Sequence, residues 1–458
     1  MNEKQINILR EIAGDDRVIT DIEDKICFGY DSTRLEYLPD AIVRASDATQ
    51  ISNIMKFANE NKIPVTPRGA ATGLSGGCLA VNGGITLLMV EMNRILDINK
   101  IDLLAEVEAG VITIDVDKAA NKYGLFYPPD PGSLKTSTIG GNIAENAGGL
   151  RGLKYGVTKD YVNSMEVVLP TGEIINVGTK TVKSVSGYNI VDLIVGSEGT
   201  LGIVTKAVLG LLPTPPDRAS MLATFAEMTQ AAKAVRDIVA AGVITATLEF
   251  IDNVTINAIE DYLKIGLDRT TGAMLLIEVD GQKGAVDIEA EIVKRECNEN
   301  NALSFKLASS DEERNKLWSA RRAALSSLAR VRPSTILEDA TVPRSRIVEL
   351  IEAVNNISKK YGLDIGIFGH AGDGNLHPTI LTDLRDKEEE IKVGKAIEEI
   401  FVETIKLEGT LSGEHGIGIT KAKFLKLEIS EDTYKLMKNI KKTFDPNNIL
   451  NPGKLFLS

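Results

Sequence analysis

A run of prolines near the middle of the chain separates two stretches with different patterns. Pro213, Pro215 and Pro216 stand within four residues of one another, and such a run stops regular strand pairing and stiffens a connection. At 458 residues the chain is also too long for one ordinary hydrophobic core. We therefore expect two domains, residues 1–215 with a core over about 39–215, and residues 216–458.

The two stretches differ in the elements that they predict. The first is rich in glycine and in short strand-like runs, and it includes a strand over residues 41–45 followed by a helix with a capping box at Asp47 and Gln50. The second alternates strand-like runs with helix-like runs, at 221–225, 229–241, 247–251, 254–263, 274–279 and 285–298. This alternation predicts an α+β domain with helices on one face of a sheet.

Charge and hydropathy limit the classes of partner. The net charge is −12, and an acidic chain is a poor match for nucleic acid or an anionic membrane. The first residues lack a secretory signal, and no apolar stretch approaches the roughly 20 residues that span a bilayer. We expect a cytoplasmic protein with no membrane span and no nucleic-acid partner.

Three glycine-rich segments in the first domain predict a large bound anion. They are residues 67–77, 131–149 and 196–205. Glycine allows close backbone approach, and successive N–H groups form a concavity that binds phosphate. Three such segments indicate a long ligand wrapped along its length. The spacing of the nicotinamide-type Rossmann fingerprint does not occur here, so the ligand is not expected on that βαβ template.

The only three histidines, His370, His377 and His415, lie within 46 positions of one another. Between the first two, Asp373-Gly374 is a dipeptide favoured in two-residue type I′ hairpin turns. In that register His370 faces His377, with Cβ atoms roughly 4.5–5.5 Å apart. Two imidazoles so placed are able to chelate one metal ion.

Glu414 is the candidate third ligand, because a set of two histidines and one carboxylate leaves a coordination position open for substrate. The neighbouring side chain, His415, then points elsewhere and suits a general base. Imidazole and carboxylate without thiolate fit Zn, Mn or Fe(II), and ligand type does not choose among them.

The chain resembles, over nearly its whole length, the FAD-linked 2-hydroxyacid dehydrogenases, which include D-lactate dehydrogenase, the glycolate oxidase D-subunit and D-2-hydroxyglutarate dehydrogenase. These belong to the vanillyl-alcohol oxidase or p-cresol methylhydroxylase flavoprotein superfamily. Six motifs in the same order carry the resemblance: residues 67–77, 131–149, 196–205, 369–377, 413–418 and 448–454.

The resemblance implies an α+β protein. Its N-terminal domain would bind FAD as in p-cresol methylhydroxylase, and its C-terminal domain would be an α+β, ferredoxin-like substrate cap over the flavin. The last 15 residues or so would return to the FAD domain.

By the same resemblance, FAD contacts residues of the three glycine-rich segments and of the C-terminal motif. The expected set is Arg68, Gly69, Ala70, Thr72, Gly73, Leu74, Ser75, Pro131, Gly132, Ser137, Thr138, Gly141, Asn142, Ala147, Gly148, Gly149, Glu198, Ile203 and Asn451. Glu198 and Ile203 would serve the adenine-side half, and Asn451 would lie near the isoalloxazine. Relatives with covalent flavin carry His or Cys within 69–71 and 142–149, where this chain has neither. Non-covalent FAD is therefore expected.

The activity implied is oxidation of a 2-hydroxy acid to a 2-oxo acid. The metal would lower the pKa of the substrate hydroxyl, His415 would take its proton, and hydride would pass to the flavin. Arg321 is the candidate partner for the substrate carboxylate, which a guanidinium matches as a two-pronged donor. Relatives that bind a second carboxylate carry Asn where this chain has Thr379, which favours a monocarboxylate, D-lactate first.

Several alternatives remain open at the level of sequence. Glycolate and D-2-hydroxyglutarate are other substrates, and the residues do not specify the enantiomer. The electron acceptor is expected to be a protein, an electron-transferring flavoprotein or an iron–sulfur subunit, with a quinone as a further choice. Two histidines and a carboxylate also describe non-haem Fe(II) oxygenases, and a non-catalytic flavin electron-transfer subunit is a third class.

Overall fold

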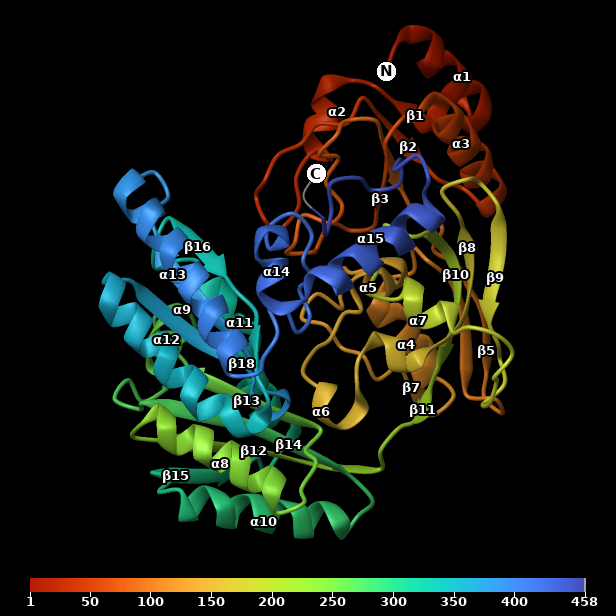
Figure 1. Cartoon of the computed structure of the whole chain (residues 1–458). Helices are drawn as coiled ribbons and strands as arrows, with labels where there is room; N and C mark the ends of the chain where they lie inside the picture. The colour runs from red at the N-terminus through yellow and green to blue at the C-terminus, as the bar shows by residue number, and fades with distance from the viewer. Residues whose placement is uncertain (457–458) are drawn as a thin grey trace. The chain divides into compact units, whose positions relative to one another are not determined.

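The computed structural model describes residues 1–456 and divides the chain into two compact units (Figure 1). Unit 1 contains Met1–Gly148, Val157–Thr214 and the segment that starts at Glu414, and unit 2 contains Gly149–Gly156 and Pro215–Gly413. The division between Thr214 and Pro215 lies within the proline run. The return to unit 1 is longer than the predicted 15 residues, because it begins at Glu414.

Unit 1 contains a four-stranded sheet in the order β1-β2-β4-β3, in which β2, β4 and β3 are parallel and β1 is antiparallel to β2. Helices α1 and α3 contribute to the same hydrophobic core as this sheet. The elements are α1 (Glu3–Ala13), β1 (Val18–Ile19), α2 (Ile22–Cys27), β2 (Ala41–Arg44), α3 (Ala48–Asn61), β3 (Val65–Arg68) and β4 (Ile85–Leu88).

Helix α3 begins where the sequence predicts. The side chain of Asp47 accepts a hydrogen bond from the backbone N–H of Gln50, 2.9 Å away, which satisfies one of the free amides at the helix N-terminus. The Gln50 side chain accepts from Ser46 N–H instead of Asp47 N–H, so the predicted capping box is only half formed. The apolar face of α3 at Ile54 and Met55 is fully buried.

The second sheet of unit 1 is antiparallel, with the order β5-β6-β10-β8-β9. It forms a separate core with α4, α5 and α7, and β7 pairs with β11 beside it. The elements are β5 (Ile95–Asn99), β6 (Leu104–Glu108), α4 (Thr113–Asn121), β7 (Leu125–Phe126), α5 (Ile139–Glu145), β8 (Val162–Val168), β9 (Ile174–Gly178), α7 (Ile190–Ile194), β10 (Ile203–Gly210) and β11 (Leu212–Pro213).

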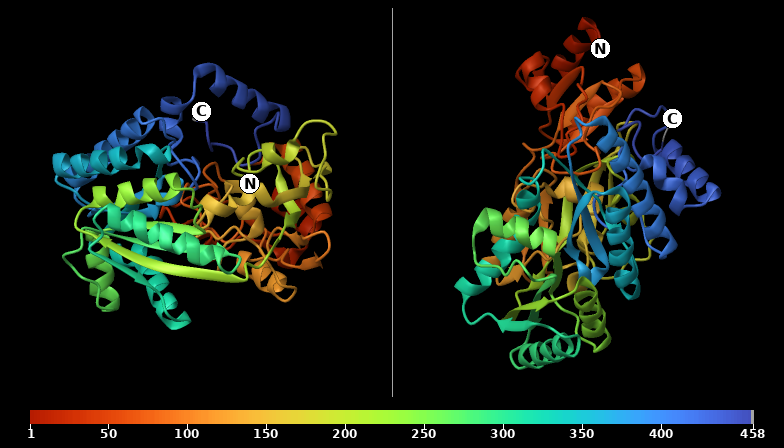
Figure 2. Two further views of the ribbon diagram at one scale, coloured as in Figure 1. Left: turned by 90° about the horizontal axis from the view of Figure 1, so that it is seen from below. Right: turned by 90° about the vertical axis from the view of Figure 1, so that its left-hand side faces the viewer.

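The C-terminal segment of unit 1 completes its first sheet. It carries α14 (Leu425–Glu428) and α15 (Glu431–Phe444), which can be followed in dark blue in Figure 2. After α15, Leu450 forms a parallel bridge with Val65. Val65 N–H donates to Ile449 O at 2.8 Å, and Asn451 N–H donates to Val65 O at 2.7 Å. The edge of β3 is thereby covered.

Unit 2 is built on one antiparallel eight-stranded sheet, with the order β15-β12-β14-β13-β18-β19-β16 and β17 paired to β19. Its first four strands follow the 4-1-3-2 order of the split βαβ, ferredoxin-like arrangement, as the resemblance implied. The strands are β12 (Asp217–Phe225), β13 (Thr247–Asp252), β14 (Ala273–Gly281), β15 (Ser304–Leu307), β16 (Ser334–Leu337), β17 (Ala340–Thr341), β18 (Asp364–His370) and β19 (Asn375–Thr382).

Helices cover both faces of this sheet, so the prediction of helices on one face is wrong. Leu275 and Ile277 of β14 join the core with α8, α10, α12 and α13, whereas Met274 and Leu276 join a second core with α9 and α11. The predicted alternation located α8, α9 and α10 but placed them all on one face, whereas α9 covers the opposite one. The helices are α6 (Gly152–Tyr155), α8 (Met228–Ala240), α9 (Asn253–Leu263), α10 (Ala285–Glu299), α11 (Asp311–Leu328), α12 (Ile347–Tyr361) and α13 (Lys387–Lys406).

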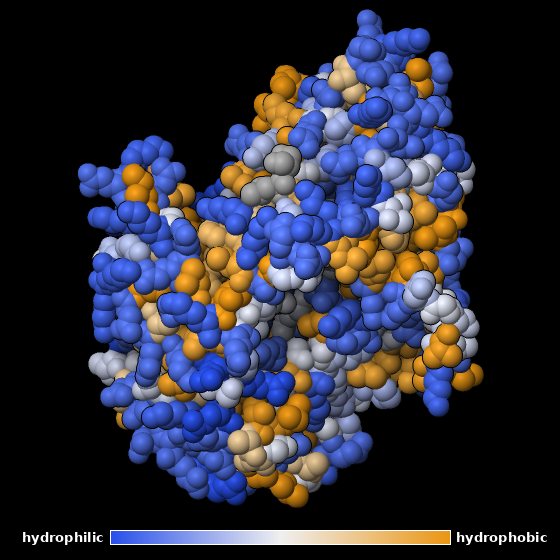
Figure 3. Space-filling view, in the orientation of Figure 1, coloured by the Kyte–Doolittle hydropathy of each residue, from blue (hydrophilic) through white to orange (hydrophobic). Residues whose placement is uncertain are grey.

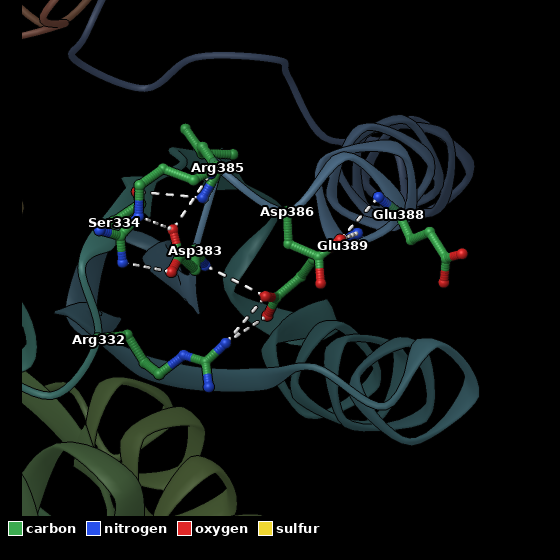
Figure 4. Close-up of polar contacts among 8 residues, drawn as sticks. Arg332, Ser334, Asp383, Arg385, Asp386, Glu388 and Glu389 are labelled. Carbon is green, nitrogen blue, oxygen red and sulfur yellow. Dashed lines mark hydrogen bonds and ion pairs between the residues drawn. The ribbon is translucent and has the colours of Figure 1, made fainter.

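A group of charged residues holds the connection between β19 and α13 (Figure 4). Arg332 Nη2 donates to both carboxylate oxygens of Glu389, at 2.8 and 2.9 Å. Arg385 binds Asp383 through two nitrogens, and the Asp386 side chain caps α13. These pairs are partly or fully exposed, so each contributes little to folding.

No helix among the described residues is both long and apolar enough to cross a membrane. Hydrophilic residues cover most of the face shown in Figure 3, with smaller hydrophobic patches between them.

Candidate active site

The hairpin that carries the first two histidines differs in register from the prediction. His377 pairs with Phe368, and His370 pairs with Asn375. A 3-10 turn over Ala371–Asp373 lies between the strands, closed by Gly374 in the left-handed region at φ 80°. The loop is two residues longer than a type I′ turn, but a shift of two residues preserves the face of every side chain. Both histidines therefore still point to one side of the sheet.

His370 and His377 are close together and buried. Their ring centroids are 5.2 Å apart and the rings are nearly perpendicular, at 89°. One ligand nitrogen of each lies within 4.8 Å of the other. The Phe368 ring lies beside His377, with centroids 5.5 Å apart. The pair lies on the α9 and α11 face of the sheet, which is the face of Phe368, and its spacing fits two ligands of one cation.

Charged residues of unit 2 surround the histidine pair. Glu249 Oε1 lies 2.6 Å from His370 Nδ1, and its other oxygen binds Arg321 Nε. Asp339 Oδ1 is 4.0 Å from His377 Nδ1. Burial acts to raise the pKa of Glu249, but the charges of Arg321 and His370 outweigh it, and the pKa is lowered. Arg321 thus binds the same carboxylate as His370.

Sequence reasoning did not find Glu249 or Asp339. Glu249 is an acidic residue within an apolar strand, and Asp339 follows Glu338 just before β17; both are fully buried. For Glu249 the available signal was its place inside a strand-like run. Most acidic residues in a chain of this composition lie in solvent, so an acid alone does not indicate a buried site.

Glu414 and His415 are the first two residues of the last segment of unit 1. Glu414 packs on the second glycine-rich segment, since its Oε2 atom lies 2.8 Å from where a Cβ atom on Gly148 would stand. His415 Nε2 lies 3.9 Å from Glu414 Oε1. The predicted ligand and the predicted base therefore lie among the glycine-rich segments.

A single peptide bond joins these residues to unit 2. Gly413 packs against the hairpin side chain Asn375, whose Nδ2 atom would lie 2.7 Å from a Cβ atom at position 413. The Cα atom of Glu414 lies about 3.8 Å from the Cα atom of Gly413, which is the fixed spacing across a trans peptide bond. The candidate third ligand is therefore the residue that follows directly after the last residue of unit 2.

The buried carboxylate of Glu198 holds the segment after His415, and Glu145 packs beside it. Glu198 accepts hydrogen bonds from Ile417 N–H at 2.7 Å and from Gly418 N–H at 2.6 Å. A Cβ atom on Gly416 would collide with Glu145. Burial raises the pKa of both glutamates, and for Glu145 the charge of Glu198 adds to the effect. The Glu198 side chain is occupied in this way, so a contact with FAD would come from its backbone.

The first glycine-rich segment offers free backbone donors. Within the described part of the chain, the N–H groups of residues 70–75, which include Ala70, Thr72, Gly73, Leu74 and Ser75, donate no hydrogen bond. Ala71 adopts the left-handed region at φ 58°, and a Cβ atom on Gly69 would collide with Thr138. The segment thus forms a cradle of amides against the second segment, which fits a pyrophosphate. Arg68, beside it, donates to Tyr30 O at 2.7 Å.

The second glycine-rich segment is only partly open. Thr138 caps α5 by accepting from Gly141 N–H at 3.2 Å. Ser137 and Asn142 turn inward and share the Thr113 hydroxyl, at 3.0 and 2.7 Å. Their side chains therefore support the loop, and a contact with FAD would use the backbone.

The remaining predicted contacts are placed as follows. A Cβ atom on Gly132, which follows Pro131, would meet no atom within 4 Å. Ala147 N–H donates to Asn142 O at 2.9 Å, whereas Gly149 groups with unit 2. The Ile203 side chain lies in a hydrophobic core of unit 1.

Asn451 links the first and third glycine-rich segments. Its Nδ2 atom donates to Gly77 O and to Glu198 O, both at 2.8 Å. The three segments, residues 414–418 and the C-terminal motif therefore converge within unit 1.

Comparison with known proteins identifies the family. Residues 39–178 match the FAD binding domain, and residues 214–455, just over half of the chain, match the C-terminal domain of FAD linked oxidases. A glycolate oxidase subunit, GlcD, of Bacillus subtilis is 48% identical over 98% of this chain and 96% of its own length. The chain belongs to the FAD-linked oxidase family.

Other relatives of this FAD-linked oxidase carry related names. A D-lactate dehydrogenase of Anaerostipes hadrus is 35% identical over 91% of this chain and 89% of its own length. In structure, p-cresol methylhydroxylase matches with a TM-score of 0.81 and 18% identity, covering 99% of this chain and 96% of its own. The predicted fold class and the FAD-linked family are confirmed. An FAD binding domain accounts for the glycine-rich segments, which a non-haem Fe(II) oxygenase would leave unexplained.

The single cysteine beside the cradle is unsuited to covalent attachment of the flavin. Burial raises the pKa of the Cys78 thiol to about 11, against the opposing charge of Arg68. Arg68 Nη1 lies 3.5 Å from its sulfur. Because the thiolate is the nucleophile, a thiol held protonated supports the expectation of non-covalent FAD.

Proposed function

We propose that this FAD-linked oxidase is a dehydrogenase that uses FAD and a divalent metal ion to oxidise a small 2-hydroxy acid to the 2-oxo acid. The observation that carries the proposal is the buried histidine pair beside Arg321, joined through the Gly413–Glu414 peptide bond to a segment that packs among the glycine-rich loops of the FAD unit.

The residues fit both a divalent metal ion and FAD. His370, His377 and Glu414 would hold the metal, since two neutral imidazoles and one carboxylate form an open donor set. The amide cradle of residues 70–75 would hold the FAD pyrophosphate. When bound, the metal acts as a Lewis acid that lowers the pKa of the substrate hydroxyl, and FAD accepts hydride from C2. Zn, Mn and Fe(II) remain equally compatible with the donors.

The chain's own groups have separate roles. Arg321 would bind the substrate carboxylate and so orient the molecule. His415 would take the hydroxyl proton, because an imidazole has an intrinsic pKa near the operating range. Glu198 fixes the backbone just after His415 through Ile417 and Gly418, which limits the positions that the imidazole can reach.

The substrate is proposed to be a monocarboxylate. Thr379 is fully buried, and its hydroxyl donates to His377 O at 3.1 Å, so it does not provide a site for a second carboxylate. Glycolate and D-lactate, the substrates in the names of the relatives, are the two candidates. D-lactate is the first expectation from the family resemblance, glycolate is supported by the GlcD relative, and 2-hydroxyglutarate ranks below both.

The direct test follows flavin reduction anaerobically with glycolate, both lactate enantiomers and D-2-hydroxyglutarate. We expect a monocarboxylate to bleach the flavin fastest. His415→Ala should slow bleaching by about 10²- to 10⁴-fold while the bound flavin is retained; undiminished bleaching would remove His415 as the base. A colourless preparation that binds no added FAD would refute the whole proposal.

A matched pair of arginines tests substrate binding. Arg321→Met should raise the apparent Kd for substrate about ten- to a hundredfold, as expected for a lost charged hydrogen bond. Arg322→Met is the control, because Arg322 lies next to it on α11 and makes only a long contact with Asn315 O at 3.5 Å. Equal effects in the two variants would show that Arg321 does not bind the carboxylate.

The electron acceptor is proposed to be a protein. The Bacillus subtilis relative is named as a subunit, which supports a partner such as an iron–sulfur subunit; an electron-transferring flavoprotein is the other choice. Reoxidation of the substrate-reduced flavin by each purified candidate, followed in stopped flow, would separate them.

A further inference from the structure

One buried carboxylate in unit 2 has no role in the function proposed so far. Glu249 lies in the middle of β13 and is fully buried, as are its neighbours Leu248 and Phe250. Leu248 and Phe250 belong to the core on the α8 side, so Glu249 points to the face of α9 and α11, where the histidine pair lies. Burying an ionised carboxylate costs several kcal/mol unless charged groups compensate.

Two groups compensate the charge of Glu249. Oε1 lies 2.6 Å from Nδ1 of His370, and Oε2 accepts from Nε of Arg321. One carboxylate therefore faces a guanidinium through one oxygen and a ring nitrogen through the other. Because a guanidinium has only donors, the Glu249 oxygen is the acceptor in that contact.

An acceptor at Nδ1 determines the tautomer of a neutral His370. The hydrogen must reside on Nδ1 to donate to Glu249, which leaves the lone pair of Nε2 for a metal ion. Histidine ligands commonly donate their second ring N–H to a carboxylate, which raises their basicity and fixes the ring.

The same carboxylate restricts Arg321. Only Nε of the guanidinium bonds to Glu249, and Nη1 and Nη2 make no hydrogen bond to any described residue. The Cζ atom stands 4.9 Å from the centre of the Phe368 ring, which limits the tilt of the plane. The Nη edge is thus left to bind a carboxylate with two parallel hydrogen bonds.

Resting on the proposed function, we propose that Glu249 is a positioning residue that sets the metal ligand His370 and the substrate-binding Arg321 relative to each other. One carboxylate fixes the ring tautomer through one oxygen and the guanidinium through the other. The distance between the metal and the substrate carboxylate is therefore set by β13 and not by the loops.

Metal affinity tests the proposal without relying on turnover. Glu249→Gln preserves shape but offers one acceptor oxygen instead of two. We expect the variant with FAD bound to bind Zn²⁺ about 10- to 100-fold more weakly, in competition with a chromophoric chelator, as for other residues that orient metal ligands. The control is Asp252→Asn, another buried acid on β13, whose side chain instead caps α9 by accepting from Thr255 N–H; its Zn²⁺ affinity should be unchanged.

A measurement on the unmodified protein covers the case in which the variant does not fold. Because the chain has three histidines, the ring ¹⁵N–¹H spectrum of the Zn²⁺-loaded, ¹⁵N-His-labelled protein is simple to assign. We expect one histidine with a protonated Nδ1 in a strong hydrogen bond and a metal-bound Nε2. The opposite tautomer at His370 would overturn the proposal.

Different results would refute the proposed function and the proposed role of Glu249. If the unmodified protein binds no divalent cation at the histidine pair, the proposed function fails. If it binds Zn²⁺ and Glu249→Gln binds it equally well, only the role of Glu249 is refuted. Equal loss of affinity in Glu249→Gln and Asp252→Asn would assign the effect to general damage of β13, which also refutes that role.

Discussion

A methyl group added at Gly140 should distort the second glycine-rich segment. Gly140 lies in the first turn of α5, and its N–H donates to Ala109 O at 2.7 Å. An added Cβ atom would stand 2.8 Å from the Ala109 Cβ, against about 3.4 Å for an ordinary contact, so the two must separate by about 0.6 Å. Ala109 is buried at the end of β6, and overpacking of such a site costs about 1–3 kcal/mol.

The strain should appear in both stability and cofactor binding. Urea unfolding of FAD-free Gly140→Ala should show the loss of about 1–3 kcal/mol. If bound FAD requires the original position of α5, its Kd should rise roughly 5- to 150-fold, since 1.4 kcal/mol is a factor of ten. Fluorescence titration of the FAD-free protein measures that Kd.

A second substitution separates this clash from other causes. Ala109→Gly removes the colliding Cβ and leaves the Ala109 carbonyl oxygen, 3.1 Å from the new methyl. In this background Gly140→Ala should cost clearly less, with a coupling of about 1–2 kcal/mol between the sites. Full additivity of the two substitutions, or an unchanged stability in Gly140→Ala alone, would refute the reasoning.

Three further outcomes are expected. Gly73→Ala should leave the unfolding free energy of the FAD-free protein unchanged, because its Cβ would meet no atom within 4 Å. The same substitution should weaken FAD binding at least tenfold. An unchanged FAD affinity would show that the amide cradle of residues 70–75 does not bind FAD. Burial raises the pKa of Asp252 to about 6, so the free energy of unfolding falls as pH rises from about 4 to 6. Asp252→Asn should therefore have a higher free energy of unfolding than wild type at pH 7, by as much as about 3 kcal/mol, but not at pH 3.5. A gain at both pH values would contradict this. Glu198→Gln should speed amide exchange at Ile417 and Gly418 roughly tenfold; unchanged exchange would show that the carboxylate does not hold them.

The sequence predicted those features that depend on local pattern. The proline run coincides with the passage from unit 1 to unit 2 between Thr214 and Pro215, and the first glycine-rich run has backbone N–H groups that donate no hydrogen bond within the described part of the chain. The histidine pair was predicted on one face from an incorrect register, since the 3-10 turn at Ala371–Asp373 lengthens the loop by two residues and strand side chains repeat every two.

Features that depend on tertiary packing could not be predicted in the same way. Nothing near Glu249 in the sequence indicates that Arg321, 72 residues away, neutralises it. The alternation of strands and helices does not state which face of a sheet each helix covers, and α9 crosses to the side opposite α8. The side chains of Ser137 and Asn142 turn inward to Thr113, which lies on another element, and local sequence does not indicate this contact.

The discontinuity of unit 1 has a consequence for how the protein is made. Its first sheet is flanked by Leu450, which reaches the ribosome's exit only after all of unit 2 has been synthesised. Unit 2, which is nearly continuous, is able to fold while the chain grows, whereas β3 keeps an open edge until the last residues arrive. Domains usually fold in order from the N-terminus; here unit 2 should fold first, and unit 1 should complete its first sheet only after Leu450 has been synthesised.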